Sequence, residues 1–175
     1  MYGIIATWRM ALEGISKADS MLKNNESAAD SIEEAIKAVE DFEYYKSVGY
    51  GGLPNEEMEV ELDAAFMDGD TLEFGCVGGV KDFANPVSIA RSLMHYDANN
   101  FLVGQGAEKY ASRHGFERKT MLTDRAKIHY HNRTKEITNT ELKPYSGHDT
   151  VGMVCLDTAG HMTSATSTSG LFMKH

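Results

Sequence analysis

Residues 148–157, His-Asp-Thr-Val-Gly-Met-Val-Cys-Leu-Asp, mark the point where a long polar segment gives way to an apolar run. The run over 151–156 has the length and composition of a buried β-strand. If the peptide bond between Asp149 and Thr150 were cut, Thr150 would carry a free α-amine beside its own hydroxyl. Such a residue holds both a nucleophile and a base, which is one known way to activate a hydroxyl. Taken alone, the stretch is also typical of a polar loop that meets a strand.

The composition around this stretch is that of a soluble globular protein. The 175 residues are 42% hydrophobic and 25% charged, enough for one domain with a core of its own. The net charge of −9 argues against a nucleic-acid partner, because non-specific binding to phosphates needs basic patches. The N-terminus has neither a basic leader nor an apolar run long enough to cross a membrane. We therefore expect a cytoplasmic protein with no membrane partner.

The cysteines and the paired histidines do not predict a metal site. Cys76 and Cys155 both lie in apolar, strand-like runs, which favours buried free thiols over a disulfide. Neither cysteine has neighbours at metal-ligand spacing. His129 and His131 could in principle ligate a metal from one face of a strand, but their polar, basic segment favours surface positions.

The first half of the chain predicts a strand, two helices and a hairpin. A β-prone run over 2–8 precedes apolar residues at helical spacing over 12–22 and 32–42, with Ser27 as the cap of the second helix. A glycine-dense loop over 47–54 lacks the Lys-Ser/Thr pair of a phosphate loop. Alternation over 57–62 predicts a half-exposed strand, joined through an Asp68-Gly69 turn to a partner over 72–77.

The second half predicts helices, a polar connector and a last pair of strands. The Asn85-Pro86 pair begins one helix, a short strand over 101–104 precedes a helix over 107–114, and the segment after Thr123 has weak helical character. Residues 134–147 resemble a mobile connector. Strands over 151–156 and 162–168 follow, with a turn at 157–160. This alternation indicates an α/β or α+β protein without fixing its topology.

Several fragments, in the same order along nearly the whole chain, resemble glycosylasparaginases, which are N-terminal-nucleophile hydrolases of the asparaginase type 2 family. The fragments are Ala6-Thr7-Trp8, Ser-Val-Gly-Tyr-Gly-Gly (47–52), Leu-Asp-Ala-Ala (62–65), Met-Asp (67–68), Asn-Pro-Val-Ser-Ile-Ala-Arg (85–91), His-Asp-Thr-Val-Gly-Met (148–153) and Thr-Ser-Thr-Ser-Gly (166–170). Each fragment alone is a weak signal, whereas the set together is specific.

The resemblance implies an α+β fold, the four-layer αββα sandwich, made as a precursor that cuts itself before Thr150. Residues 1–149, with the polar tail 134–147, would form the α subunit, and residues 150–175 the start of the β subunit, in a homo-oligomer of αβ units. For self-cleavage the Thr150 hydroxyl must attack the Asp149 carbonyl, which a strained peptide would favour because resonance protects a planar one. The Asp149 carboxylate or His148 could accept the hydroxyl proton.

The same resemblance implies an amidohydrolase that cleaves the side-chain amide of a small asparagine derivative without a metal or an organic cofactor. The freed α-amine of Thr150, with an ordinary pKa of about 7.7–8.0, suits a general base near neutral pH. Thr168 resembles the second active-site threonine, although the neighbouring hydroxyls leave its register open by two residues. Trp8 would border the substrate, the alternative being a core aromatic. Ser47 and its glycine loop are expected beside the nucleophile without chemistry of their own.

Two other interpretations stay open. An L-asparaginase or β-aspartyl peptidase of the same superfamily usually has Gly-Thr at the cut, so Asp149 and Thr7-Trp8 favour a glycosylasparaginase. A non-catalytic binding module is the rival from another class. In the family, the residues that clamp the substrate and form the oxyanion hole follow the position of His175. We therefore expect the 175-residue chain to hold half of the sandwich, to be inactive alone and to expose a large apolar face.

Overall fold

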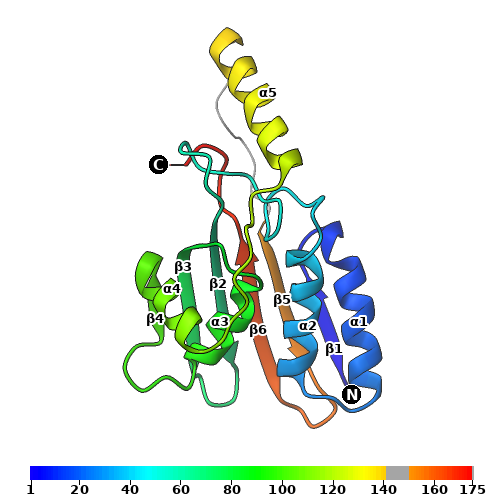
Figure 1. Ribbon diagram of the computed structural model, residues 1–175. Coiled ribbons are helices and arrows are strands. Elements are labelled where there is room, and N and C mark those ends of the chain that lie inside the picture. Colours follow the sequence, from blue (N-terminus) through cyan, green and yellow to red (C-terminus); the bar gives the residue numbers. More distant parts are fainter. Residues whose placement is uncertain (141–149, 175) are drawn as a thin grey trace.

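A six-stranded sheet forms the centre of the computed structural model, which describes residues 1–140 and 150–174 (Figure 1). In sheet order the strands are β1 (Gly3–Ala6), β5 (Val151–Leu156), β6 (Met162–Thr168), β2 (Glu61–Asp68), β3 (Phe74–Lys81) and β4 (Phe101–Val103). All neighbours are antiparallel except β3 and β4, which are parallel. The strand that follows Thr150 is therefore an inner strand, between the first strand of the chain and β6.

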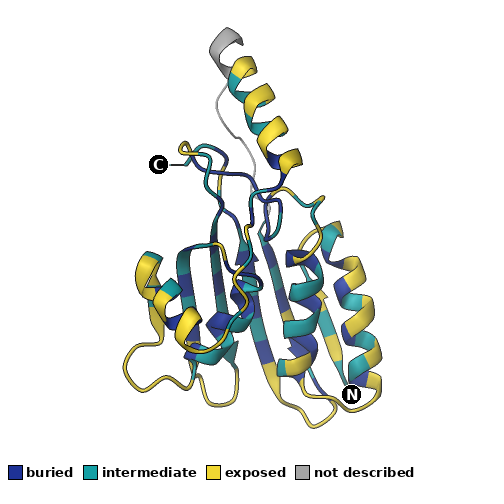
Figure 2. Cartoon of the chain, in the orientation of Figure 1, coloured by how far each residue is buried: buried dark blue, intermediate teal, exposed yellow. Residues whose placement is uncertain are grey.

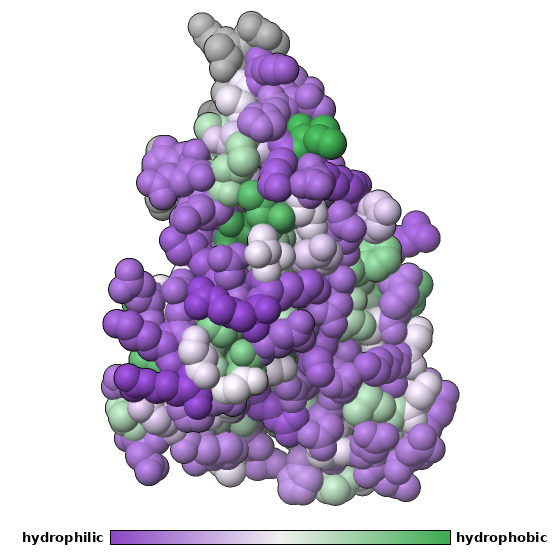
Figure 3. All heavy atoms as spheres, viewed as in Figure 1, coloured by the Kyte–Doolittle hydropathy of each residue, from purple (hydrophilic) through white to green (hydrophobic). Residues whose placement is uncertain are grey.

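The helices cover one face of this sheet. They are the 3₁₀ turn η1 (Arg9–Ala11), α1 (Leu12–Lys23), α2 (Ala28–Glu40), α3 (Pro86–Leu93) and α4 (Gly104–Arg113), whereas α5 (Asp124–Thr140) extends beyond the end of the sheet (Figure 1). Helix α2 packs on β5 and β6, α3 packs on β2 and β3, and α1 packs against α2 and β1 (Figure 1). Their apolar stripes join the sheet in one core, while the outer surface of this layer is mainly hydrophilic (Figures 2 and 3). No helix in the described ranges has the length and hydrophobicity needed to cross a bilayer.

The other face of the sheet has no covering layer among the described residues. Side chains on β5 alternate between the faces, so that Val151, Met153 and Cys155 are buried under the helices while Val154 is 44% exposed. Its partner on β1, Ile5, is 78% exposed. The α+β class is thus confirmed as one sheet with one layer of helices, and Val154 and Ile5 are exposed apolar side chains on the other face of the sheet.

Local sequence signals account for several helix ends. The Ser27 hydroxyl accepts a hydrogen bond from the Asp30 N–H at 3.0 Å, as the capping prediction requires. Helix α1 ends at Lys23 with Asn24 as its C-cap residue, and α3 begins with Pro86 in its first turn. The last strand pair and its turn have the predicted ranges, 151–156 and 162–168. Both cysteines are free; Cys155 is buried, and Cys76 is half-buried rather than buried as predicted.

The strand predicted over 57–62 is wrong in its first half, because β2 begins only at Glu61. The Asn55 side chain accepts hydrogen bonds from the N–H groups of Glu57 and Glu59 at 3.0 and 2.9 Å. Met58 has a left-handed φ of 63°. A local turn held by an asparagine side chain therefore replaces the ladder that the alternating residues favour.

The connector predicted over 134–147 is wrong for residues 134–140, which continue helix α5. The Thr134 hydroxyl donates to the Tyr130 carbonyl oxygen one turn earlier, at 2.8 Å, and Arg133 pairs with Glu136 three residues later. The ion pair has the i, i+3 spacing that stabilises a polar helix with little apolar periodicity. The rest of the predicted connector, 141–147, lies outside the described residues, as do His148 and Asp149.

Candidate active site at the ends of strands β5 and β6

Thr150 and Thr168 occupy neighbouring positions on the uncovered face of the sheet. The register of β5 with β6 pairs Val151 with Ser167, and one further step sets Thr150 opposite Thr168. Residues directly opposite in an antiparallel pair have Cβ atoms about 4.5–5.5 Å apart. Because Val151 and Ser167 point to the helices, alternation directs Thr150 and Thr168 to the other face. Two residues predicted for the site, 18 positions apart, are thereby brought together.

Thr7 fixes the backbone on both sides of Val151. Its hydroxyl donates to the Thr150 carbonyl oxygen at 2.9 Å and accepts from the Gly152 N–H at 2.9 Å. The Thr7 N–H also donates to the Gly152 carbonyl oxygen at 2.9 Å. The sequence pattern includes Thr7 only as part of a motif, because a contact with a residue 143 positions away leaves no local signal.

The glycine loop meets the end of β6 at Thr168. The Ser47 carbonyl oxygen accepts from the Thr168 hydroxyl at 3.2 Å and from the Ser169 N–H at 2.6 Å. Gly49 has a φ of 63°, and a Cβ at this position would lie 2.2 Å from the carbonyl oxygen of Glu40. This close approach between the loop and the end of α2 is open only to glycine. The loop therefore connects α2 to the candidate site.

Trp8 lines a cavity together with Ser47 of the glycine loop. The cavity has a volume of about 300 Å³ and is lined by Trp8, Met10, Tyr44, Tyr45, Lys46 and Ser47. Trp8 is 57% exposed and has a φ of 61°, a conformation that non-glycine residues rarely adopt. The alternative of a core aromatic is therefore wrong for this residue.

Glu40 is a fully buried carboxyl group behind the candidate site. One of its oxygens accepts from the Ser167 hydroxyl at 2.6 Å and from the Val87 N–H at 3.1 Å, and the other accepts from the Asn85 amide at 3.2 Å. Burial raises the pKa of Glu40 to about 8 against the effect of these hydrogen bonds. The group joins the end of α2, the start of α3 and strand β6.

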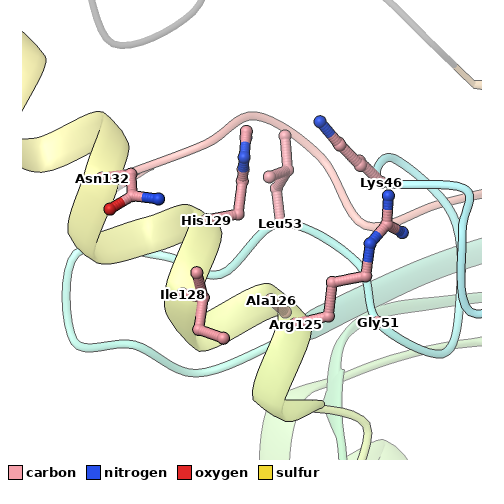
Figure 4. A pocket seen from close by; sticks show the side chains of 8 residues that line it. All are labelled: Lys46, Gly51, Leu53, Arg125, Ala126, Ile128, His129 and Asn132. Atoms are coloured by element: carbon pink, nitrogen blue, oxygen red, sulfur yellow. The ribbon is translucent and has the colours of Figure 1, made fainter.

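A second cavity, of about 200 Å³, lies between the glycine loop and α5 and carries basic side chains. Lys46, which precedes the loop, and Arg125 of α5 lie at one end of it, with His129 further along the helix (Figure 4). Burial, with the charges of Lys46 and Arg125, lowers the pKa of His129. His129 is half-buried and His131 is exposed, on a helix rather than a strand. Within residues 1–140 and 150–174, no three His, Cys, Asp or Glu side chains are grouped as metal ligands.

The family model described as asparaginase, Asparaginase_2, matches residues 6–175. The chain belongs to the Asparaginase_2 family. Among its curated relatives, an N(4)-(Beta-N-acetylglucosaminyl)-L-asparaginase of Elizabethkingia miricola is 33% identical over 98% of this chain and 50% of its own length. An isoaspartyl peptidase/L-asparaginase of Rattus norvegicus is 36% identical over 93% and 50%, and a plant-type L-asparaginase of Thermococcus kodakarensis is 34% identical over 98% and 56%.

Asparaginase_2 members are asparagine amidohydrolases of the N-terminal-nucleophile class, which confirms the resemblance. This chain spans about half the length of the curated relatives it matches. The names of those relatives cover three activities, so membership of the family leaves the substrate open.

Proposed function

We propose that this chain belongs to a self-processing amidohydrolase in which Thr150, freed by cleavage of the Asp149–Thr150 bond, attacks the side-chain amide of an asparagine derivative. The observation that carries the proposal is the pairing of Thr150 with Thr168 on one face of the sheet, where Thr7 holds the backbone of Thr150. A hydroxyl nucleophile needs a base and a fixed orientation, and the α-amine of the same residue is a base held at a short, fixed distance from the hydroxyl.

The proposed chemistry has two stages. In the first, the Thr150 hydroxyl oxygen attacks the Asp149 carbonyl carbon, the C–N bond breaks, and the nitrogen takes the hydroxyl proton. Water then hydrolyses the resulting ester, which leaves the Asp149 carboxylate and a free Thr150 amine. In the second stage this amine accepts the hydroxyl proton as the oxygen attacks the substrate amide, and it passes the proton to the departing amine. Water hydrolyses the acyl-enzyme and releases aspartate. The Thr168 hydroxyl, opposite Thr150, would orient the attacking oxygen.

A glycosylated asparagine is the first candidate substrate, supported by the Asp149-Thr150 pair and by Thr7-Trp8. The relative from Elizabethkingia miricola is named for the cleavage of such a substrate, as an N(4)-(Beta-N-acetylglucosaminyl)-L-asparaginase. The second candidate is a β-aspartyl peptide or free asparagine, supported by isoaspartyl peptidase/L-asparaginase relatives that are 36% and 37% identical to this chain.

Turnover by the protein expressed from its complete reading frame tests the proposal. N4-(N-acetylglucosaminyl)asparagine, asparagine and a β-aspartyl dipeptide would be compared for the unaltered protein and for Thr150→Ala. We expect hydrolysis of at least one substrate and a loss of about 10³-fold or more in the variant, as for the removal of other catalytic nucleophiles. Thr158→Ala, at the far turn of the same hairpin, is the matched control and should keep full activity. An active Thr150→Ala protein would refute the proposal.

A further inference from the structure

We propose that Trp8, Tyr44 and Tyr45 form the subsite for the group attached to the amide nitrogen of the substrate, and that this group is a sugar ring. The inference rests on the proposed function and adds to it the two tyrosines as residues that set specificity. These tyrosines lie in the segment between α2 and Ser47, outside the fragments on which the family resemblance depends.

The position of the 300 Å³ cavity carries the first step. One lining residue, Trp8, directly follows Thr7, whose hydroxyl donates a hydrogen bond to the carbonyl of Thr150. Another lining residue, Ser47, accepts a hydrogen bond from the Thr168 hydroxyl through its carbonyl oxygen. The cavity is thus lined by the residue that holds Thr168 and by the residue next to Thr7, which holds Thr150. An amide that reached Thr150 would have this cavity beside it to receive its departing group.

The aromatic wall of the cavity carries the second step. Tyr44 is 60% exposed, and its ring is nevertheless held in place, with the Arg125 guanidinium 4.5 Å from its centroid and the Phe42 ring at 5.5 Å. The Phe42 ring also lies 4.7 Å from that of Tyr45, whose hydroxyl bonds to Glu13. Exposed rings that are fixed by their neighbours provide contact area at a low entropy cost.

The chemistry of the lining selects the ligand class. Three aromatic rings and Met10 provide apolar surface, and the Lys46 ammonium and Ser47 hydroxyl provide hydrogen bonds. A sugar ring has a C–H face for such rings and hydroxyls for the polar groups. The volume is at the lower end of the range for small-ligand pockets. Ammonia, released from free asparagine, would use none of these contacts. A departing amino acid would depend chiefly on Lys46 for its carboxylate.

The test compares substrates in the self-processed protein from the complete reading frame. We expect the double variant Tyr44→Ala, Tyr45→Ala to lose about tenfold or more in kcat/KM for N4-(N-acetylglucosaminyl)asparagine, and to change less than about twofold for asparagine. The Tyr44→Phe, Tyr45→Phe variant keeps both rings and should stay close to the unaltered protein. Tyr96→Ala, at a distant partly exposed tyrosine, controls for general loss of aromatic surface.

Inhibition by free N-acetylglucosamine, with asparagine as the substrate, gives a second readout: its inhibition constant should rise about tenfold in the alanine variant. Equal losses on both substrates, or an unchanged inhibition constant, would overturn the subsite. So would a Lys46→Gln variant that loses only β-aspartyl dipeptide cleavage while the tyrosine variants lose nothing. A protein that hydrolyses none of the three substrates would refute the proposed function itself, which is a different outcome.

Discussion

The buried carboxyl of Glu40 makes the stability of this fold depend on pH in an unusual direction. Its pKa is raised from the ordinary 4.5 to about 8, chiefly by burial. Below pH 4.5 the group is protonated in both the folded and the unfolded chain and has no effect on the balance. Between pH 4.5 and 8 the unfolded chain loses this proton while the folded chain keeps it. The contribution of Glu40 to stability is therefore lost as the pH rises through this window.

The magnitude follows from the difference between the two pKa values. At about 1.4 kcal/mol for each pKa unit, the gap between 4.5 and about 8 corresponds to a loss of about 5 kcal/mol across the window. Glu40→Gln removes the ionisation and retains an acceptor for the Ser167 hydroxyl and the Val87 N–H. Its amide nitrogen would face the Asn85 amide, which now donates to Glu40 at 3.2 Å, so the variant loses about 1 kcal/mol at low pH. Between pH 5 and 8 it should gain about 4 kcal/mol relative to the unaltered protein.

Urea unfolding followed by circular dichroism at pH 5, 6, 7 and 8 measures this difference. Both proteins would carry Thr150→Ala, so that cleavage cannot alter the chain during the series. Other titrating groups cancel when the two proteins are compared at each pH. Glu26→Gln, at an exposed glutamate, is the matched control for the removal of one carboxyl group. A Glu40→Gln difference that stays constant within about 0.5 kcal/mol from pH 5 to 8 would refute the reasoning.

Three further predictions concern other residues. Thr7→Val removes the hydrogen bonds to the Thr150 carbonyl and the Gly152 N–H, so it should reduce the free energy of unfolding by about 1–2 kcal/mol and slow self-cleavage. Thr7→Ser retains both hydrogen bonds and is the control. Urea unfolding and mass spectrometry over time would measure the two effects, and equal cleavage rates for the two variants would contradict the prediction. Gly49→Ala should prevent soluble folding, because its Cβ would lie 2.2 Å from a carbonyl oxygen. Gly115→Ala has open space around its Cβ and a φ of 77°, so it should lower the free energy of unfolding by only about 1–2 kcal/mol. Comparable yields of soluble protein from the two variants would contradict this prediction. Burial raises the pKa of Cys155 to about 11, so an aromatic disulfide reagent at pH 8 should modify Cys76 first, and faster labelling of Cys155 would oppose its burial.

The elements that sequence predicts well are those with local causes. The strands over 151–156 and 162–168 have turn residues between them and apolar alternation within them, and both agree with the structure. Helix α2 has a capping serine and an apolar stripe, and it begins directly after Ser27. Local patterns do not determine the order of strands in a sheet. The α+β class and the uncovered sheet face are therefore predicted from the family resemblance.

The features that sequence does not predict depend on contacts between distant residues or on competing local bonds. The Asn55 side chain ends the alternation before β2, and polar pairs extend α5 past Thr134. Thr7 and Glu40 reach partners 143 and 127 positions away, so neither is marked in its own surroundings. The sequence predicts a site of Thr150, Thr168 and Trp8, with His148 and Asp149 for self-cleavage. The structure adds the residues that hold Thr150 and Thr168 in place, while His148 and Asp149 lie outside the described residues.

The central claim is that Thr150 becomes an N-terminal residue by self-cleavage. The intact mass of the protein from its complete reading frame, measured under denaturing conditions with no protease added, tests it most directly. The account predicts two masses that divide the chain between Asp149 and Thr150, and a single mass for Thr150→Ala. A single uncut mass for a protein that nevertheless hydrolyses an asparagine derivative, or the same two masses from Thr150→Ala, would contradict it.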